Sequence, residues 1–198
     1  LLRNQVLAAQ FLYALTHGYV LQEEVLRWEQ DALHEGSDRP PITLYRVHLR
    51  ACVALEVGSR DAYFVLTAAL NKMTFVAGEE ARLPMRCTRE CYVTIFNLAA
   101  NDRFSILFPN LYDSVCALRS LEEFVFPRAG LALVMRPFPT HQRDAEAFLV
   151  VATKQPLNAD TRLGRRDDLP IGDVLRMLSD LPLSERAERL LVYEVRAK

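Results

Sequence analysis

The chain has 198 residues, which suffices for one sizeable domain or for one domain with part of a second. Hydrophobic residues make up 51% and charged residues 25%, the proportions of a globular protein with a substantial core. The 24 basic residues against 25 acidic ones give a net charge of -1. This balance excludes the basic excess of nucleic-acid-binding proteins and gives no reason to expect adhesion to anionic membranes.

The N-terminal segment carries apolar residues at helical spacing, which predicts an amphipathic helix over residues 2–16. Polar residues interrupt its apolar run, so we expect neither a signal-peptide core nor a membrane span there. Because residue 1 is a leucine, we expect a mature form or an excised fragment of a longer chain. Residues 19–33 fit either a helix or an irregular strand, and the breaker-rich residues 34–42 predict a loop.

Residues 44–57, "LYRVHLRACVALEV", alternate between apolar and polar residues and predict a long, half-buried antiparallel strand. Its polar face carries Arg46, His48 and Arg50. This basic row is a candidate docking site for an acidic partner. The alternative interpretation is a solvated strand face that also discourages edge-to-edge pairing.

Short alternating runs continue through the middle of the chain and predict about seven strands of a β-sandwich. The runs are residues 62–71, two short strands in 72–87 around Ala77-Gly78, a hairpin of 91–98 and 103–108, and residues 123–126, 130–138 and 145–154. Both faces of residues 91–98 are largely apolar, which favours a central strand over an aromatic ligand platform. The sequence therefore predicts a mainly β fold, an antiparallel sandwich.

The strand over 103–108 stops at "FPN", where Pro109 and Asn110 predict a strand end followed by a turn. The exposed tip of this turn, Asn110 with Tyr112, is a candidate contact for a partner.

The C-terminal region changes to helical spacing. Ile171, Val174, Leu175 and Leu178 mark one face of a helix, and a second short helix is predicted over 181–190 with Ser184 as its N-cap. Residues 190–195 predict a closing strand that pairs with the preceding sheet.

Four cysteines are present, at positions 52, 87, 91 and 116. On one continuous strand, Cys87 and Cys91 would lie about 13 Å apart, beyond the roughly 7 Å limit for a disulfide. A turn over 88–90 would bring the two sulfurs together, which makes this pair a candidate disulfide. No second close pair of Cys or His completes a zinc site, so we predict no metal.

Enzyme signatures such as G-x-S-x-G, H-E-x-x-H, the P-loop and G-x-G-x-x-G do not occur in the sequence. The four histidines, at positions 17, 34, 48 and 141, are scattered through the chain, and the spacing around His48 supplies neither a nucleophile nor an orienting carboxylate. We therefore expect no catalytic residues, no cofactor and no enzymatic activity, with an unrecognised hydrolase as a minor alternative.

Four pieces, "LNKMTFVAGEEARLP", "CYVTIFNL", "LFPN" and "EAFLVVATK", occur in an order that resembles a bacterial domain-of-unknown-function family. Its signature is a Gly-Glu segment, a Tyr-containing strand and a Leu-Phe-Pro-Asn turn, and the resemblance covers about residues 60–155. It implies an immunoglobulin-like β-sandwich appended to envelope lipoproteins, to flagellar-assembly-like proteins, or to kinases and caspase-like proteases. Where that family usually has an Asp-Gly turn, this chain has Asn101-Asp102-Arg103.

The N-terminal portion also resembles the end of a small α/β domain in lipoprotein and flagellar-assembly-like proteins. We therefore expect a helical or partial α/β portion over 1–58, and a sandwich with C-terminal helices and a closing strand over 59–198.

The expected function is a non-enzymatic interaction or scaffolding module of the bacterial cell envelope or periplasm. Its expected partner is a protein, or alternatively a glycan, with no nucleic acid and no membrane insertion by this segment. The alternative is an accessory recognition domain of a cytosolic signalling or effector protein.

Overall fold

The computed structural model describes residues 18–33, 42–55 and 58–198. The predicted helix over 2–16 and most of the predicted loop over 34–42 lie outside these residues. The strands are β1 (Gly18–Leu33), β2 (Ile42–Leu55), β3 (Leu66–Ala68), β4 (Thr74–Val76), β5 (Glu80–Ala81), β6 (Leu83–Cys87), β7 (Cys91–Leu98), β8 (Arg103–Phe108), β9 (Ala117–Leu118), β10 (Glu123–Phe126), β11 (Leu133–Val134), β12 (Arg143–Thr153), β13 (Leu169–Pro170) and β14 (Arg186–Arg196). The helices are α2 (Ala159–Leu163), α3 (Ile171–Ser179) and a 3-10 turn at Leu183–Glu185.

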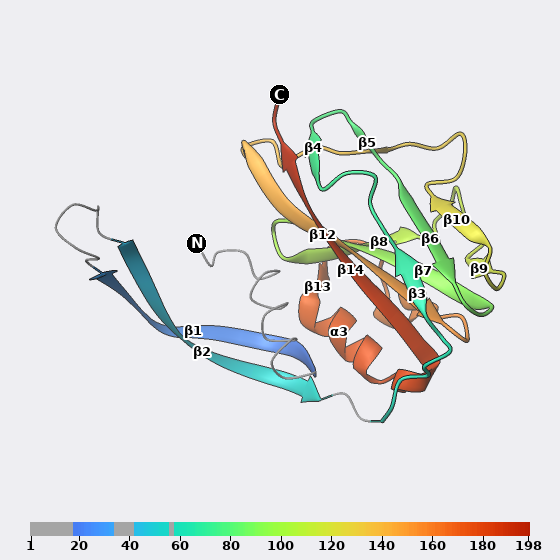
Figure 1. Ribbon diagram of the computed structural model, residues 1–198, viewed down its shortest axis with the longest axis horizontal. Coiled ribbons are helices and arrows are strands. Elements are labelled where there is room, and N and C mark those ends of the chain that lie inside the picture. The colour runs from blue at the N-terminus through green and yellow to red at the C-terminus, as the bar shows by residue number, and fades with distance from the viewer. Residues whose placement is uncertain (1–17, 34–41, 56–57) are drawn as a thin grey trace.

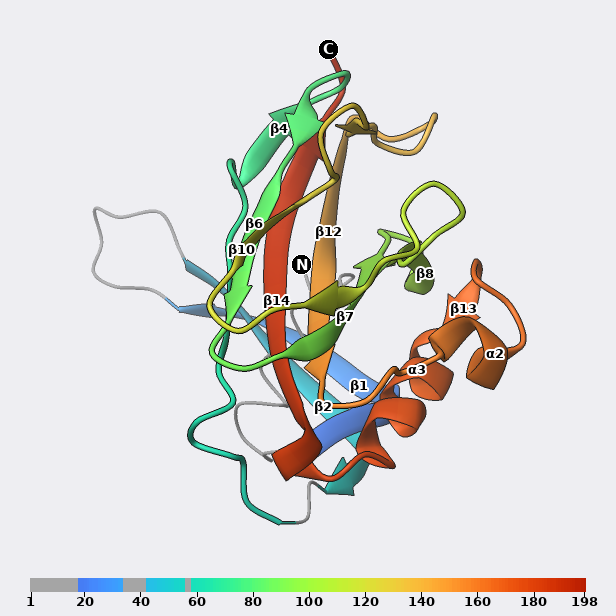
Figure 2. The same ribbon diagram turned by 90° about the vertical axis from the view of Figure 1, so that its right-hand side faces the viewer.

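One large sheet forms the centre of the molecule (Figure 2), with the strand order β13-β8-β7-β12-β14-β4, and β9 pairs with β7 as well. Its pairings are antiparallel except for the parallel pairing of β14 with β4. The predicted hairpin of 91–98 and 103–108 is confirmed as β7 and β8. Strand β7 lies between β8 and β12, and its two faces are apolar because other layers cover both sides of the sheet.

Two small sheets cover one face of the central sheet, one ordered β10-β6-β3 and the other formed by β11 and β5. Side chains from both layers interlock in one core, for example Leu83 and Met85 of β6 with Ile95 of β7 and Val150 of β12. The mainly β fold with two packed antiparallel layers agrees with the predicted sandwich.

Helix α3 covers the opposite face of the central sheet. Its buried residues Val174, Leu175 and Leu178, the face that helical spacing indicated, pack with Phe96 of β7 and Leu149 of β12 in a second core. The central sheet is therefore apolar on both faces, and β12 contributes alternate side chains to the two cores.

Strands β1 and β2 form a separate antiparallel hairpin that extends away from the sandwich (Figure 1), and β1 contacts α3. The predicted strand over 44–57 is confirmed as β2 through Leu55, and residues 19–33 are a strand rather than a helix. Two irregularities in the register, between Val20 and Gln22 and between Val25 and Arg27, explain why the alternation of β1 is hard to read from sequence.

The second helix predicted over 181–190 is wrong. Only Leu183–Glu185 forms a 3-10 turn, and strand β14 begins at Arg186, in register with β12. The buried Arg186 donates hydrogen bonds to the backbone carbonyls of Leu178 and Leu181, which fixes the start of the strand. Pairing with β12 overrides the local helical propensity of this segment. The predicted strands over 62–71 and 130–138 are confirmed only as the short strands β3 and β11.

Candidate functional site

The predicted contact at Asn110 and Tyr112 lies on a loop over residues 109–116 that leaves and re-enters the same edge of β7. Phe108 of β8 pairs with Ile95, and the carbonyl of Cys116 accepts a hydrogen bond from the backbone N–H of Val93, 2.8 Å away. The two ends of the loop therefore meet the sheet at neighbouring positions. This is the geometry of a compact Ω-type loop.

Asn110 holds this loop together from inside. Its side-chain nitrogen donates to the Leu107 carbonyl at 2.6 Å, and its side-chain oxygen accepts from the backbone N–H groups of Tyr112 and Asp113 at 2.8 and 2.9 Å. The Asn110 N–H donates in turn to the Asp113 carbonyl at 2.8 Å. Asn110 is thus mainly a structural residue of the loop, in agreement with the turn chemistry expected of asparagine.

A second anchor fixes the far side of the loop. The N–H at Nε of Arg128 donates a hydrogen bond shared between the two oxygens of the buried Asp113 carboxylate, at 2.8 and 2.9 Å, and Arg128 also donates to the Val115 carbonyl at 2.7 Å. The Arg128 guanidinium lies over the Phe124 ring, 4.6 Å from its centre. The loop is therefore tied to the strand that precedes Arg128.

This internally bonded loop presents apolar side chains to solvent. Leu111 is 96% exposed, Tyr112 is 86% exposed and Val115 is 62% exposed. An ordered backbone that holds large apolar groups away from the core is a feature of recognition surfaces, since packing does not explain those side chains. We call these three residues the loop patch.

The predicted basic row lies on β2, where His48 and Arg50 are exposed; the side chain of Arg46 is outside the described ones. The register of the hairpin sets Arg46 opposite Glu29 and Arg50 opposite Glu24. Cross-strand pairs of opposite charge stabilise a hairpin by themselves. The structure thus offers an internal reason for the basic row, and a role in docking stays a prediction.

Cys87 and Cys91 end β6 and begin β7, so they connect the small sheet to the central sheet. The residues 88–90 between them turn the chain, as the candidate disulfide requires, and both sulfurs are buried free thiols. A hydrogen bond from the Cys91 thiol lowers the pKa of Cys87 to about 7, while the same contact and burial raise that of Cys91. Disulfide formation by this pair stays a prediction.

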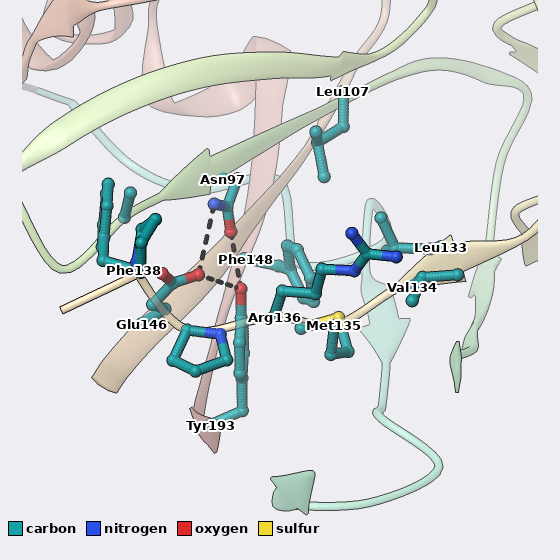
Figure 3. A pocket seen from close by; sticks show the side chains of 13 residues that line it. Asn97, Leu107, Leu133, Val134, Met135, Arg136, Phe138, Glu146, Phe148 and Tyr193 are labelled. Atoms are coloured by element: carbon teal, nitrogen blue, oxygen red, sulfur yellow. Dashed lines mark hydrogen bonds between the residues drawn. The ribbon is translucent and has the colours of Figure 1, made fainter. Parts of the chain in front are cut away.

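Sequence reasoning missed a pocket of about 290 Å³ between β7, β8 and the segment before β12. It is lined by residues 133–139, by Asn97, Ala99 and Leu107, and by Glu146, Phe148 and Tyr193 (Figure 3). Most of this lining is apolar, with a few polar groups that converge on one side, which is the usual composition of a small-molecule site.

Three polar side chains from three adjacent strands meet in this pocket (Figure 3). The Tyr193 hydroxyl lies 2.7 Å from the Asn97 side-chain oxygen and 2.7 Å from Oε2 of Glu146, and the Asn97 nitrogen donates weakly to the same Oε2 at 3.4 Å. One phenolic hydrogen cannot satisfy two acceptors at once. The Tyr193 hydroxyl therefore donates to Oε2 of Glu146 or to the Asn97 side-chain oxygen, one at a time.

Burial favours the protonated form of the Glu146 carboxyl. Glu146 is 7% exposed, and desolvation raises the pKa of its carboxyl above the usual value, with a smaller contribution from the nearby Asp144. Hydrogen bonds from Tyr193, Asn97 and the Ala100 N–H act in the opposite direction. Burial also raises the pKa of Tyr193, and the carboxyl of Glu146 adds to this effect. The pocket therefore holds a carboxyl group that is costly to ionise.

Next to the pocket, the buried Asp144 binds His141, with 2.5 Å between Oδ1 and Nδ1, and accepts the Phe138 N–H at 2.6 Å. This pair holds the segment before β12 in place. Nothing in the described part places a serine, threonine or cysteine nucleophile against His141. No group of three or more His, Cys, Asp or Glu residues there is arranged to hold a metal ion.

The alternation of residues along β12 indicates a buried position for Glu146. It shares a strand face with Phe148 and Val150, both core residues, so alternation alone predicts that this carboxyl is buried. Its partners Asn97 and Tyr193 gave no such signal, because they reach it only through the strand order β7-β12-β14.

Comparison with known families adds one observation. Residues 74–156 match the model of a family described as domain of unknown function (DUF4384). The match begins in β4 and ends just after β12, so it contains the loop patch and every pocket residue except Tyr193. It covers less than half of the chain and supports the resemblance to a bacterial domain of unknown function.

Comparison with curated proteins and with solved structures found no match to the chain. None of the helices in the described residues is long and apolar enough to cross a membrane.

Proposed function

We propose that the chain is a non-enzymatic recognition module that binds a protein partner through the loop patch, Leu111, Tyr112 and Val115. The observation that carries this proposal is the contrast between a loop bonded internally through Asn110 and Asp113 and the near-complete exposure of Leu111 and Tyr112. A preorganised loop loses little conformational entropy on binding, and exposed tyrosines commonly anchor interfaces.

Site-specific photocrosslinking tests this proposal. A photoreactive residue at position 112, in the organism that makes the chain, should capture one partner, which is then purified for calorimetry. Tyr112→Ala and Leu111→Ala should each weaken binding of the purified partner at least about tenfold, as expected for an anchor residue. Tyr63 is 75% exposed on another part of the surface, so Tyr63→Ala is the matched control and should bind like wild type.

Equal affinity of the Tyr112→Ala and wild-type proteins for the captured partner would refute the role of the loop patch. A glycan partner is the alternative within this class. It would appear as binding to a glycan array that Tyr112→Ala abolishes.

We further propose that the module works in the bacterial envelope or periplasm. The resemblance described above supports this location, and the Cys87–Cys91 pair provides a test because the turn at 88–90 brings the two thiols together. Thiol titration of the denatured native protein, with and without reductant, should show two thiols that appear only after reduction. Four free thiols would favour the cytosolic alternative, an accessory domain of a signalling or effector protein.

The finer classification of the sandwich as immunoglobulin-like is also a proposal. Its support is the antiparallel pairing of β6 with β10 and of β7 with β8 and β12 around one core. An experimental structure in which these strands superpose on an immunoglobulin-like domain with the same connections would bear it out. Different connections would contradict it.

A further inference from the structure

The pocket beside β8 contains a guanidinium group and a carboxyl group, and neither has an ionic partner among the described residues. Among the residues that the structure describes, none forms a hydrogen bond or an ion pair with the exposed guanidinium of Arg136. The buried Glu146 has only neutral hydrogen-bond partners in the described part of the chain. In Figure 3 the Arg136 side chain extends toward Leu133 and away from Glu146.

Apolar groups line the rest of the pocket. Phe148 is buried at the base of the pocket, and Leu107 and Leu133 face it from two sides (Figure 3). A ligand that satisfies the whole pocket must therefore offer a cation to the carboxyl, an anion to the guanidinium and an apolar group to the wall. A volume of about 290 Å³ is at the small end of ligand sites, which excludes a large cofactor.

We propose that this pocket binds a free α-amino acid with an apolar side chain. The ligand ammonium binds Glu146, the exposed Arg136 side chain turns toward Glu146 to bind the ligand carboxylate, and the ligand side chain packs against Phe148 and Leu107. A buried carboxyl without a cationic neighbour is costly to ionise, and a ligand ammonium removes that cost. Arginine suits the other end because its guanidinium binds a carboxylate with two parallel hydrogen bonds.

The site predicts a pH dependence of its own. Glu146 faces Asp144 on its own strand, Tyr193 on β14, and Asn97 and the Ala100 N–H at the end of β7. None of these neighbours is a cation, so the carboxyl ionises late, and the bound ammonium favours its ionised form. Affinity for the amino acid should therefore rise with pH until Glu146 is ionised in the free protein, and then level off.

A titration followed by ¹H–¹⁵N NMR spectra tests the proposal with four small probes. L-Leucine should shift the amide signals of residues 133–138 and of Asn97. N-acetyl-L-leucine lacks the ammonium, L-leucinamide lacks the carboxylate and glycine lacks the side chain. Each of these three should bind at least about tenfold more weakly, as expected for the loss of one charged hydrogen-bonding group or one apolar side chain.

Two variants test which residue binds which charged group of the ligand. Arg136→Gln changes an exposed residue and should remove the preference for leucine over leucinamide, and Glu146→Gln should remove the preference for leucine over N-acetyl-leucine. Arg86→Gln, an exposed arginine on the outer side of β6, is the matched control and should bind leucine like wild type.

The four small probes test the proposal in the wild-type protein, so the test does not depend on the folding of a variant. Equal binding of leucine, N-acetyl-leucine and leucinamide would overturn the proposal. Signal changes confined to residues outside the pocket, or no change at millimolar leucine, would overturn it as well.

Discussion

Glu146 is the residue whose ionisation should most affect stability. Burial raises its pKa in the folded protein above the value in the unfolded chain. Such a group stabilises the fold fully below its unfolded pKa, near 4.5, and this contribution is lost as the pH rises through the folded pKa. Each unit by which the pKa is raised corresponds to about 1.4 kcal/mol lost at high pH.

We therefore predict that Glu146→Gln makes the protein less sensitive to high pH. Urea unfolding should give similar free energies of unfolding for the variant and the wild type near pH 4. The variant should become relatively more stable as the pH rises toward 8, because glutamine keeps the hydrogen bonds without ionising. Glu123→Gln, at an exposed carboxylate, controls for the loss of one negative charge. A difference between Glu146→Gln and wild type that is independent of pH would contradict the buried-acid interpretation.

At the level of single residues, local chemistry was readable from the sequence and distant contacts were not. Asn110 was recognised because an asparagine after proline satisfies its own neighbouring backbone, within three residues. The contact of Tyr193 with Glu146 spans 47 residues and depends on which strands are adjacent. No pattern in the sequence specifies that adjacency.

In the loop over 109–116, we expect different residues to be responsible for stability and for binding. Asn110→Ala removes three side-chain hydrogen bonds that hold the loop, so it should lower the free energy of unfolding by about 1–3 kcal/mol. Tyr112→Ala removes only an exposed side chain and should change it by less than about 0.5 kcal/mol. Chemical denaturation of both variants checks this contrast. A loss for Tyr112→Ala as large as that for Asn110→Ala would show that Tyr112 packs against the protein.

Among the elements, the strands with a regular pattern of apolar residues were predicted from the sequence. The strands whose bounds depend on pairing with another strand were not. β2 and β8 alternate between apolar and polar residues, and β7 is a short run that is apolar on both faces. β14 begins at Arg186, inside a segment with helical residues, because its backbone pairs with β12 along the whole strand. The same dependence on partners explains why β3 and β11 are shorter than their apolar runs.

At the scale of the whole molecule, the two cores share the central sheet and should unfold together. Leu83 lies in the core under the small sheets and Leu178 in the core under α3, and both are fully buried. Leu83→Ala and Leu178→Ala should each cost about 2–5 kcal/mol and shift the same single transition. Urea unfolding followed by circular dichroism measures both effects. Two separate transitions in the Leu178→Ala protein would show that α3 and the sandwich are independent units.

The path of the chain along β7 also determines where insertions and deletions can be accepted during evolution. Because the residues flanking the loop, Phe108 and Cys116, join the sheet at neighbouring positions, the ladder is complete whatever the chain does between them. Closing a longer loop costs only about 0.6 kcal/mol for each doubling of its length. Residues can therefore be added or removed at 111–115 without shifting the register of any strand. Related chains are free to diversify at this point, and each length would present a different surface from the same sheet.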